Sequence, residues 1–528
     1  MSNLDSVPIP TPLKPDRLEY WLNGYDTETT KFLVQGFTNG FKVGFSGKTN
    51  SDIPKNLKSA MEFPDSVDKL VEKELLAGRI AGPFSKPPFK EFQCSPIGLV
   101  LKKDGVNFRL IHHLSFPEGS SINEQIDREW ASVTYATIED AVNLVSATCH
   151  QAFMAKTDVK NAFRTVPLHP SVRNLFLFHW KDKFYVDLAL PMGCSSSCFI
   201  FETLSTAVNW IAEKKLNIPM IHILDDFFLA SVSKPIGSLQ LNSFLELCLD
   251  IGLPMAPDKT FGPDNVLSFV GFEIDTIKQE IRLPFEKIEK MREKIQEFMA
   301  RDKVTLREMQ SLLGLLNFAC RVVLPGRPFL RRLIDLTIGI KKPKHFIRLT
   351  RQAKADLVMW QKFLSSFNGK VFFLERALPA HDIGLFTDAS GKIGYGAVLG
   401  NAWFQGRWSG WWLQQNITLL ELYPIVLAIE TWGEILRNKR LILHTDNLAL
   451  VGVLSNQTSK EPLVMILVRR LVLRCLHYNI VLNAKHVEGK LNILCDALSR
   501  FQMRRFWEHA PGADKLPTAI PQLPQQLG

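Results

Sequence analysis

Two adjacent carboxylates interrupt an apolar stretch near the middle of the chain. In "IHILDDFFLA" (221–230), Asp225 and Asp226 stand between isoleucine and leucine on one side and two phenylalanines on the other. Two like charges about 4 Å apart repel by roughly 4 kcal/mol at an effective dielectric near 20. A buried pair therefore needs a cation, or one carboxylate must hold a proton. The segment predicts a chemical site, and the alternative is a strand end that turns into solvent.

A third apolar-flanked acid favours the chemical interpretation. Asp158 ends a strand-like run in "FMAKTDVKNAFRTVPLHP" (153–170). With Asp225 and Asp226 it would supply three hard oxygen donors, which suit Mg²⁺, with Mn²⁺ as a substitute. Two such ions about 3.5–4 Å apart can activate an attacking hydroxyl and stabilise a leaving phosphate oxygen.

A second set of acids lies in the C-terminal part of the chain, each at the end or flank of a predicted element: Asp388, Glu421, Asp446 and Asp496. Acids in such places can converge without a local cluster in the sequence. Taken singly, each is more often a helix cap or a surface residue. His486 precedes the last of these acids by 496 − 486 = 10 residues. An imidazole there could relay protons, although a lone histidine is usually structural.

Three cations lie on a predicted β-hairpin between residues 95 and 114. An Asp-Gly turn signal joins the strand-like stretches "SPIGLVLK" and "NFRLIHHL". The hairpin carries Lys102, Lys103 and Arg109. On the residues alone, a solvated hairpin face explains these charges as well as a binding role does.

The apolar period changes to that of helices beyond residue 284. Apolar residues recur at three- and four-residue steps: Phe285, Ile288, Met291, Ile295 and Phe298. A capping box, Thr305 with Glu308, predicts a second helix. This helical pair indicates a separate all-helical subdomain, and the basic stretch 327–354 is a candidate connector to a polyanion.

Strand signals return at residue 383 and predict the order β-β-α-β-α-β-α. The prediction reads "GYGAVLGNAW" (394–403) as one strand, residues 418–437 as a helix, and one further helix that ends near residue 477. The proline-rich stretches at the two ends, "VPIPTPLKP" (7–15) and "PGADKLPTAIPQLPQQLG", predict an extended, unpacked arm and a linker.

Composition sets broad limits on the class of protein. The 528 residues are 46% hydrophobic and 22% charged, typical of a folded protein with several domains. The net charge of 63 − 53 = +10 is spread along the chain and only weakly favours polyanion partners. Eight cysteines lack zinc spacing and predict free thiols. With no signal pattern and no membrane-length apolar run, we expect a location in the cytoplasm or nucleus and no membrane partner.

The order of these segments resembles the reverse transcriptase family. An Asp-x-x-x-Ala-Phe segment is followed by "PMGCSSSCFIFE" (191–202) and then by the apolar-Asp-Asp strand. The hairpin precedes them, and "GLPMAPDKT" (252–260) and "LSFVGFEID" (267–275) follow. The resemblance implies a mixed α/β (α+β) chain with the right-hand polymerase fold of fingers, palm and thumb. Its implied partners are an RNA template, a DNA primer and deoxynucleoside triphosphates.

The resemblance also implies roles for single residues. Asp158, Asp225 and Asp226 would hold two Mg²⁺ ions, while Lys102 or Lys103 with Arg109 would grip the triphosphate. The implied contacts around the nucleotide are an aromatic ring beneath the sugar, a turn against the templating pair and a proton donor to pyrophosphate, respectively Phe163, Met192 with Gly193, and Lys259.

The chain departs from the family pattern at two places. Leu224 stands directly before the aspartate pair, where many relatives have a different type of residue. His112 and His113 lie where relatives often carry acidic or aromatic residues, and the sequence offers no explanation beyond a packed hairpin.

The second acidic set is similar to the ribonuclease H family in order and context. That family has Asp in its first strand, Glu in its first helix, Asp after its fourth strand and Asp in its closing helix. The similarity implies that Asp388, Glu421, Asp446 and Asp496 hold two metal ions, and that His486 is a histidine of a mobile loop. The implied reaction is hydrolysis of the RNA strand of an RNA–DNA hybrid.

Several segments together resemble the DIRS-type retrotransposons, which integrate through a tyrosine recombinase. They are "RLIHHLS", "PMGCSSSC", "HILDDF" and "VTLREMQSLLGLLNFA". A tyrosine recombinase of the same element is therefore an expected partner. The predicted divisions are an N-terminal extension, fingers with palm, thumb, connection region, ribonuclease H-like domain and proline-rich tail, at 1–60, 61–278, 279–335, 336–380, 381–502 and 503–528.

Three classes of function compete at this point. All seven acidic positions are present, which favours an active polymerase with ribonuclease H activity. An inactive or host-retained copy would bind nucleic acid without extending a primer. A purely structural protein would have no affinity for a hybrid duplex.

Overall fold

The computed structural model describes most of the chain, in two compact units. It describes residues 7, 9–102, 105–366, 370–371, 378–379, 385–437, 439–445, 447–478, 480–486 and 492–521. The first unit comprises residues 1–270 with 274–278, and the second comprises residues 271–273 with 279–528.

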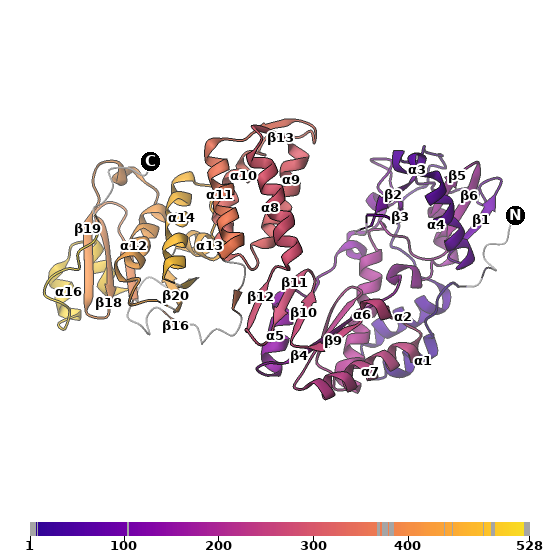
Figure 1. Ribbon diagram of the computed structural model, residues 1–528, viewed down its shortest axis with the longest axis horizontal. Helices are drawn as coiled ribbons and strands as arrows, with labels where there is room; N and C mark the ends of the chain where they lie inside the picture. Colours follow the sequence, from indigo (N-terminus) through magenta and orange to yellow (C-terminus); the bar gives the residue numbers. More distant parts are fainter. Residues whose placement is uncertain are drawn as a thin grey trace. The chain divides into compact units, whose positions relative to one another are not determined.

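The first unit combines helices with short antiparallel sheets (Figure 1). Its helices are α1 (Pro15–Trp21), α2 (Thr27–Asn39), α3 (Lys58–Glu62), α4 (Pro64–Leu76), α5 (Ile138–Thr148), α6 (Ser197–Lys215) and α7 (Lys234–Ile251). Its strands are β1 (Ile80–Phe84), β2 (Ile97–Leu101), β3 (Phe108–His112), β4 (Phe153–Asp158), β5 (Leu177–Trp180), β6 (Lys183–Asp187), β7 (Met220–Ile223), β8 (Asp226–Ser231), β9 (Phe261–Asp264) and β10 (Val266–Phe269).

A four-stranded antiparallel sheet, in the order β7-β8-β4-β9, is the centre of this unit. Helices α5, α6 and α7 pack against its strands. Residues that alternate along β8, Phe227 and Leu229, join the main core with Phe201 of α6 and Phe244 of α7. The sheet is thus anchored by apolar side chains of its central strands, which fixes where those strands end.

The predicted hairpin is confirmed as β2 and β3, which pair from Ile97 with His112 to Leu101 with Phe108. A second small sheet has the order β1-β6-β5. The aromatic rings of Phe178 and Tyr185 stack with centroids 5.2 Å apart and help to join the two sheets in one apolar cluster.

The second unit begins with helices and ends in an α/β part (Figure 1). Its helices are α8 (Phe285–Met299), α9 (Leu306–Ala319), α10 (Arg331–Asp335), α11 (Arg351–Ser366), α12 (Ile417–Trp432), α13 (Leu448–Asn456), α14 (Pro462–His477), α15 (Ile493–Ser499) and α16 (Met503–His509). Its strands are β12 (Glu280–Arg282), β13 (Lys303–Thr305), β14 (Phe346–Arg348), β15 (Lys370–Val371), β16 (Leu378–Pro379), β17 (Leu385–Ala389), β18 (Gly394–Leu399), β19 (Ala402–Arg407), β20 (Arg440–Thr445) and β21 (Val481–His486), while β11 (Phe272–Asp275) spans the division between units.

The predicted helical pair is confirmed as α8 and α9. Thr305 and Glu308 form the expected capping box at the start of α9. Four of the five residues of the predicted stripe in α8 are buried, but Phe285 is 73% exposed. This residue is the first of the helix, and its side chain therefore lies beyond the face that packs against the neighbouring helices.

The C-terminal α/β part differs from its prediction at two places. The stretch 394–403 contains a hairpin instead of one strand, because Gly400 adopts φ +60° in the two-residue turn between β18 and β19. The single helix predicted before residue 477 is two helices, since Gln457 ends α13 in a left-handed conformation. Strands β17-β18-β19 are antiparallel, and β16-β20-β21 are parallel.

The prediction of an unpacked N-terminal arm is wrong. Residues 9–14 are extended, but Leu13 is buried and the Thr11 hydroxyl donates to the carbonyl of Thr165 at 2.7 Å. The proline-rich segment after α16 also packs: Thr518 N–H donates to the Trp403 carbonyl at 2.7 Å. Proline makes both segments extended, but their donors and apolar side chains still find partners on the fold.

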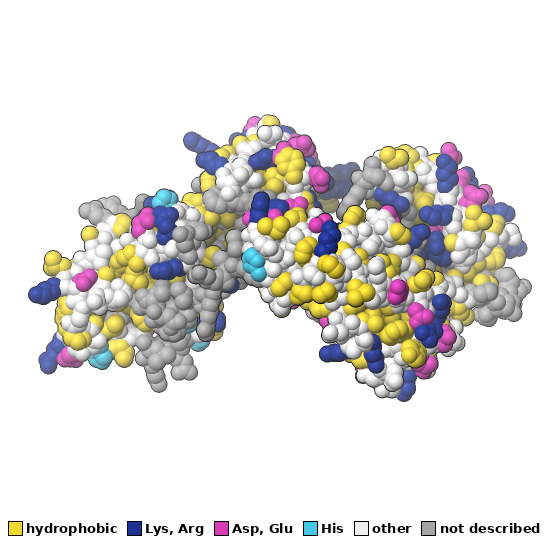
Figure 2. All heavy atoms as spheres, turned by 60° about the horizontal axis from the view of Figure 1, so that its bottom comes forward, with side chains coloured by type: hydrophobic (Ala, Val, Ile, Leu, Met, Phe, Trp, Pro, Cys, Tyr) yellow, Lys and Arg dark blue, Asp and Glu magenta, His cyan; other side chains and the backbone are white. Residues whose placement is uncertain are grey.

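The charges on the surface agree with an expectation from composition. On the face seen in Figure 2, Lys and Arg side chains are dispersed among acidic and apolar ones. Among the described helices, none is both long and apolar enough to cross a bilayer. All eight cysteines are unpaired, as predicted.

Gly252 offers a test of the packing of the N-terminal segment. It has φ +79°, and a Cβ there would overlap the Pro12 carbonyl. Gly252→Ala should release residues 9–22, so that trypsin cleaves after Arg17 about tenfold faster, equivalent to a local opening that is about 1.4 kcal/mol easier. Gly78→Ala is the matched control, because Gly78 has φ +66° and open space around it. Equal cleavage rates in the two variants would contradict the packing.

Candidate active sites

The three acids of the first set meet at one end of the central sheet. Asp158 is the last residue of β4, and Asp226, the first residue of β8, pairs directly with it. Asp225 lies in the two-residue turn that joins β7 to β8, since Ile223 pairs with Asp226. The backbone N–H of Val159 donates to the Asp225 carbonyl at 2.9 Å. The structure thus brings together three side chains that the sequence predicted as one site.

The charges of these acids act on one another. Burial, followed by the charges of Asp158 and Asp225, raises the pKa of Asp226 from 3.8 to about 6. Burial and the charge of Asp158 also raise the pKa of Asp225. The site therefore holds more negative charge than its surroundings neutralise, and without a cation Asp226 keeps its proton up to a higher pH than an ordinary aspartate does.

Two lysines supply part of the missing positive charge. The Nζ atom of Lys259 lies 2.8 Å from both carboxylate oxygens of Asp158. Although burial opposes the effect, the hydrogen bonds and charge of Asp158 raise the pKa of Lys259. Lys156, two residues before Asp158 and on the same face of β4, was not predicted; burial lowers its pKa, and the charge of Asp226 opposes that effect. The sequence did carry a signal for Lys156: it lies two residues before Asp158 on the same predicted strand, so both side chains point to one face.

The three carboxylates suit the binding of a hard divalent cation, provided that the cation displaces Lys259. Carboxylate oxygens are the ligands that Mg²⁺ prefers, and a cation would relieve the repulsion that raises the pKa of Asp226. Within the described part of the chain, no three His, Cys, Asp or Glu side chains already form a ready metal-binding group. Because the Lys259 ammonium neutralises Asp158, a metal ion would have to displace it.

The structure describes two of the three cations predicted on the hairpin. Arg109 lies exposed on β3. Its positive charge partly offsets the rise in the pKa of Asp225, so the structure places Arg109 within electrostatic reach of the acids. Lys102 is exposed directly after β2. Lys103 lies outside the described residues.

Three predicted substrate contacts lie on the elements next to the acids. Phe163 is half-buried in a short 3₁₀ helix, η4 (Ala162–Thr165), with its ring edge-on to Phe201 at 5.9 Å. Met192 is 37% exposed. Gly193 has φ +105°, and a Cβ there would lie 2.9 Å from the His112 carbonyl oxygen. The backbone of Gly193 thus lies close to the hairpin, and its contact with the templating pair stays a prediction.

Asn123 holds the turn at Gly193 and was missed from the sequence. Its amide nitrogen donates to the Gly193 carbonyl at 2.8 Å, and its amide oxygen accepts from Ser195 N–H at 2.9 Å. No sequence signal marks this residue, because its two partners lie about seventy positions further along the chain.

The structure also explains the unusual His112. Its ring is buried between the carboxylate of Asp187 and the carbonyl of Leu177, each 3.1 Å from a ring nitrogen. Arg164 lies on the other Asp187 oxygen at 2.7 Å and also contacts Glu74. Although burial works the other way, Arg164 and His112 hold the pKa of Asp187 below its usual value. The histidine therefore joins the hairpin to β5 and β6.

Three acids of the second set lie on β17 or on helices that pack against it. Asp388 belongs to β17, and α12, which carries Glu421, and α15, which carries Asp496, both pack on this strand. Ser499 of α15 donates to Asp388 at 2.5 Å. Asp446 lies outside the described residues.

Glu421 and His486 both lie near the end of β20. The hydroxyl of Thr445, the last residue of β20, lies 3.4 Å from a Glu421 carboxylate oxygen. His486 pairs with Thr445 in the parallel β20–β21 ladder. The prediction of a loop position for His486 is wrong, because the strand extends to include it, with the imidazole exposed.

Two arginines hold Asp496. One oxygen lies 2.6 Å from Arg500 Nε and the other 2.7 Å from Arg505 Nη1. Although burial opposes the effect, these bonds lower the pKa of Asp496. The carboxylate is therefore held as an anion, and its position beside α16 is set by these two partners.

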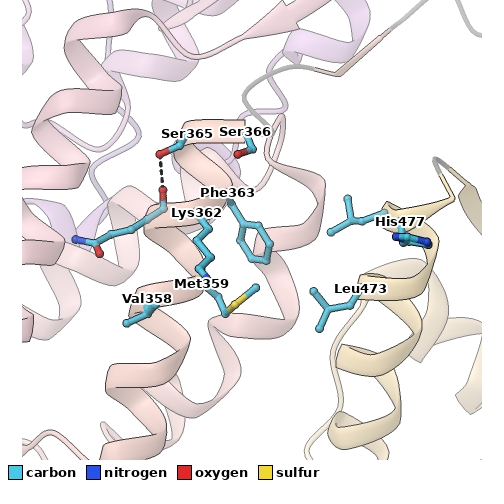
Figure 3. A pocket seen from close by; sticks show the side chains of 10 residues that line it. Val358, Met359, Lys362, Phe363, Ser365, Ser366, Leu473 and His477 are labelled. Atoms are coloured by element: carbon cyan, nitrogen blue, oxygen red, sulfur yellow. Dashed lines mark hydrogen bonds between the residues drawn. The ribbon is translucent and has the colours of Figure 1, made fainter.

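A pocket of about 630 Å³ lies in the second unit, between α11 and α14 (Figure 3). Met359 and Phe363 of α11 face Leu473 and His477 of α14 across it. None of the predicted site residues lines this pocket, so cavity size alone does not locate the chemistry of this chain.

Comparisons with known proteins agree with the geometry of the first set. Residues 104–274 match the family model described as reverse transcriptase (RNA-dependent DNA polymerase), and this range includes all three acids. Residues 104–274 are therefore similar to a reverse transcriptase domain. Part of the chain is also similar to viral polyproteins.

The curated relatives are distant in sequence. The Gag-Pro-Pol polyprotein of Mason-Pfizer monkey virus is 24% identical over 303 residues, which are 55% of this chain and 15% of that polyprotein. The Pro-Pol polyprotein of feline foamy virus is 25% identical over 163 residues, 31% of this chain and 13% of that polyprotein. The matched region therefore spans less than a sixth of these relatives.

The solved structure of a foamy viral protease–reverse transcriptase in complex with double-stranded DNA has a similar fold. It is 17% identical, with a TM-score of 0.50, and the match covers 90% of this chain and 82% of that chain. This likeness, with the mixture of helices and sheets, shows the predicted right-hand polymerase fold of α/β class.

The raised pKa of Asp226 predicts that the stability of the metal-free protein depends on pH. Its folded-state pKa of about 6 exceeds the ordinary value of 3.8, so the folded chain binds more protons than the unfolded chain between these pH values. The free energy of unfolding therefore falls as the pH rises from about 4 to about 6, on the order of 2 kcal/mol for this group. Asp226→Asn should remove that loss.

Urea unfolding in EDTA checks this prediction. Asp226→Asn should match the wild type at pH 4 and exceed its stability at pH 7, and added Mg²⁺ should narrow the difference at pH 7. A stability difference that is the same at both pH values would contradict the assignment.

Proposed function

We propose that this chain is an RNA-directed DNA polymerase that also cleaves the RNA strand of an RNA–DNA hybrid. The observation that carries the polymerase proposal is the meeting of Asp158, Asp225 and Asp226 at one sheet end, with too little positive charge around them. This arrangement suits phosphoryl transfer, in which positioning and charge neutralisation do most of the work.

The three carboxylates would hold two Mg²⁺ ions, or Mn²⁺ in their place. The bound ions would activate the primer 3′-hydroxyl and stabilise the pyrophosphate leaving group. The protein's part is to fix the carboxylates by strand pairing and by the Val159–Asp225 backbone bond. Arg109 would add positive charge on the side of the incoming deoxynucleotide triphosphate.

Other residues would define the space of the nucleotide. Phe163, held by Phe201, would lie beneath the sugar and exclude a 2′-hydroxyl. Met192 and Gly193 would border the templating pair, in a turn that Asn123 holds. In the arrangement seen, Lys259 neutralises Asp158, and proton donation by Lys259 to pyrophosphate stays a prediction.

The ribonuclease H proposal is supported by Asp388, Glu421 and Asp496 on elements packed around β17. With Asp446 they would hold a second pair of metal ions. A metal ion at Asp496 would compete with the two arginines that now bind its carboxylate. Exposed His486, at the end of β21, would lie at the rim of this site.

The origin that we propose is a DIRS-type retrotransposon, with a tyrosine recombinase of the same element as a partner. The segments that support this proposal include "RLIHHLS", whose first histidine is His112. In the structure this histidine is buried and contacts Asp187, so it has a structural role.

Two variants should separate the two activities. Asp225→Asn should lower primer extension on an RNA template by on the order of 10³-fold or more and leave hybrid cleavage intact, because it removes a ligand of one site only. Asp388→Asn should do the reverse. Extension of a labelled DNA primer and cleavage of a labelled hybrid, both with Mg²⁺, measure the two rates.

Asp182→Asn is the matched control, because Asp182 is an exposed aspartate in the β5–β6 turn of the first unit. It should leave both rates unchanged. A well-folded wild type that binds primer–template but does not extend it would discard the polymerase proposal and indicate a nucleic-acid-binding copy.

A further inference from the structure

The turn that carries Asp225 has an unfavourable backbone conformation. Leu224, the first of its two residues, adopts φ +53°, a left-handed conformation that suits glycine or asparagine and is rare for a bulky residue. Such a conformation persists only where the surroundings hold it. The residue that immediately follows is Asp225, so the position of this carboxylate depends on what holds the turn.

Glu202 of α6 holds the turn from one side. Its residue is 9% exposed, and one carboxylate oxygen accepts the Leu224 N–H at 3.0 Å. The other oxygen lies 3.2 Å from Nε2 of His222, which is on β7. Thr206, one helical turn along α6, lies 3.3 Å from the same ring nitrogen. One buried carboxylate thus contacts both the strand before the turn and the turn itself.

The opposite side of the turn is held by the segment that carries Asp158. The Asp225 carbonyl accepts the N–H of Val159 at 2.9 Å. The two peptide groups of the turn are therefore bonded in opposite directions, one to α6 and one to the end of β4. These two bonds set the distance between the Asp225 and Asp158 carboxylates.

We propose that Glu202 is a positioning residue for Asp225, acting through the turn backbone and not by contact with substrate or metal. The proposal rests on the polymerase function proposed above. A buried, charged acceptor is suited to this task because a carboxylate binds a backbone N–H more strongly than a neutral group does. Glu202 itself is largely buried, which limits the access of water to that bond.

Two substitutions at Glu202 separate positioning from simple core packing. Glu202→Leu keeps most of the volume but removes the acceptor of the Leu224 N–H. It should lower kcat for nucleotide addition by about 10–100-fold, as expected for a displacement of reacting groups by about 1 Å. It should also raise the Mg²⁺ concentration for half-maximal extension, and leave the KM for primer–template unchanged. Glu202→Gln keeps an acceptor oxygen and should stay within about threefold of the wild type.

The matched controls lie on the same helix and in the turn. Glu213 is an exposed acid of α6, so Glu213→Leu should change none of these values. Leu224→Gly removes the conformational penalty of the left-handed residue, and it should restore part of the rate lost in Glu202→Leu. A loss caused only by a damaged core would not be restored in this way.

Amide hydrogen exchange of residues 220–228 gives a readout that does not need activity. Glu202→Leu should speed exchange there, relative to Glu213→Leu. Wild-type kcat, Mg²⁺ dependence and exchange in Glu202→Leu would overturn the proposal. If that variant does not fold, Glu202→Met decides, because it also lacks an acceptor for the Leu224 N–H: unchanged exchange and Mg²⁺ dependence in Glu202→Met would overturn the proposal. If the wild type does not extend a primer, the proposed polymerase function is refuted. The exchange comparison would still test whether Glu202 holds the turn.

Discussion

Three carboxylates come together where β4 meets β8, and the folded chain holds them there against their mutual repulsion. Part of that repulsion is offset by Lys259, which binds both oxygens of Asp158. Burial and the remaining repulsion raise the pKa of Asp226. Apolar packing of the strand interiors must supply the free energy that keeps this arrangement, because the site itself does not favour folding in the absence of a cation.

The surroundings of this site are fixed by a buried ionic network rather than by apolar contacts alone. Arg164, largely buried, joins Asp187 to Glu74, and His112 completes the contact to the hairpin. This network lies on the segments that carry Phe163 and the turn at Gly193. Removal of one member would leave uncompensated charges in the interior, which is costlier than the loss of an exposed ion pair.

Local patterns in the sequence predicted much of the fold, but they did not predict contacts between segments that are distant in the sequence. The stripe of α8, the capping box of α9 and the acids at strand ends were all visible in short windows. The β18–β19 hairpin was missed although Gly400 with Asn401 forms a known turn signal. Asn123 and Glu202 could not be found in this way, because their partners are 70 and 22 residues away.

The wrong predictions for the terminal segments have a related physical cause. Proline content shows that a segment cannot continue a helix or a central strand, but not whether its remaining polar groups find partners. Thr11 and Thr518 do find them, on η4 and β19. His486 was placed in a loop by family spacing, whereas pairing with Thr445 extends the strand to include it.

The attachment of the N-terminal segment has a consequence for biosynthesis. Arg17 forms its ion pair with Asp250, 233 residues further along, and Lys14 N–H bonds the carbonyl of Ile251. At translation rates of about 5–20 residues per second, roughly 12–50 s separate the emergence of these partners from the ribosome. During that interval α1 can pack against α2 but lacks its partners on α7, so its ion pair and backbone bond form only after α7 has been synthesised.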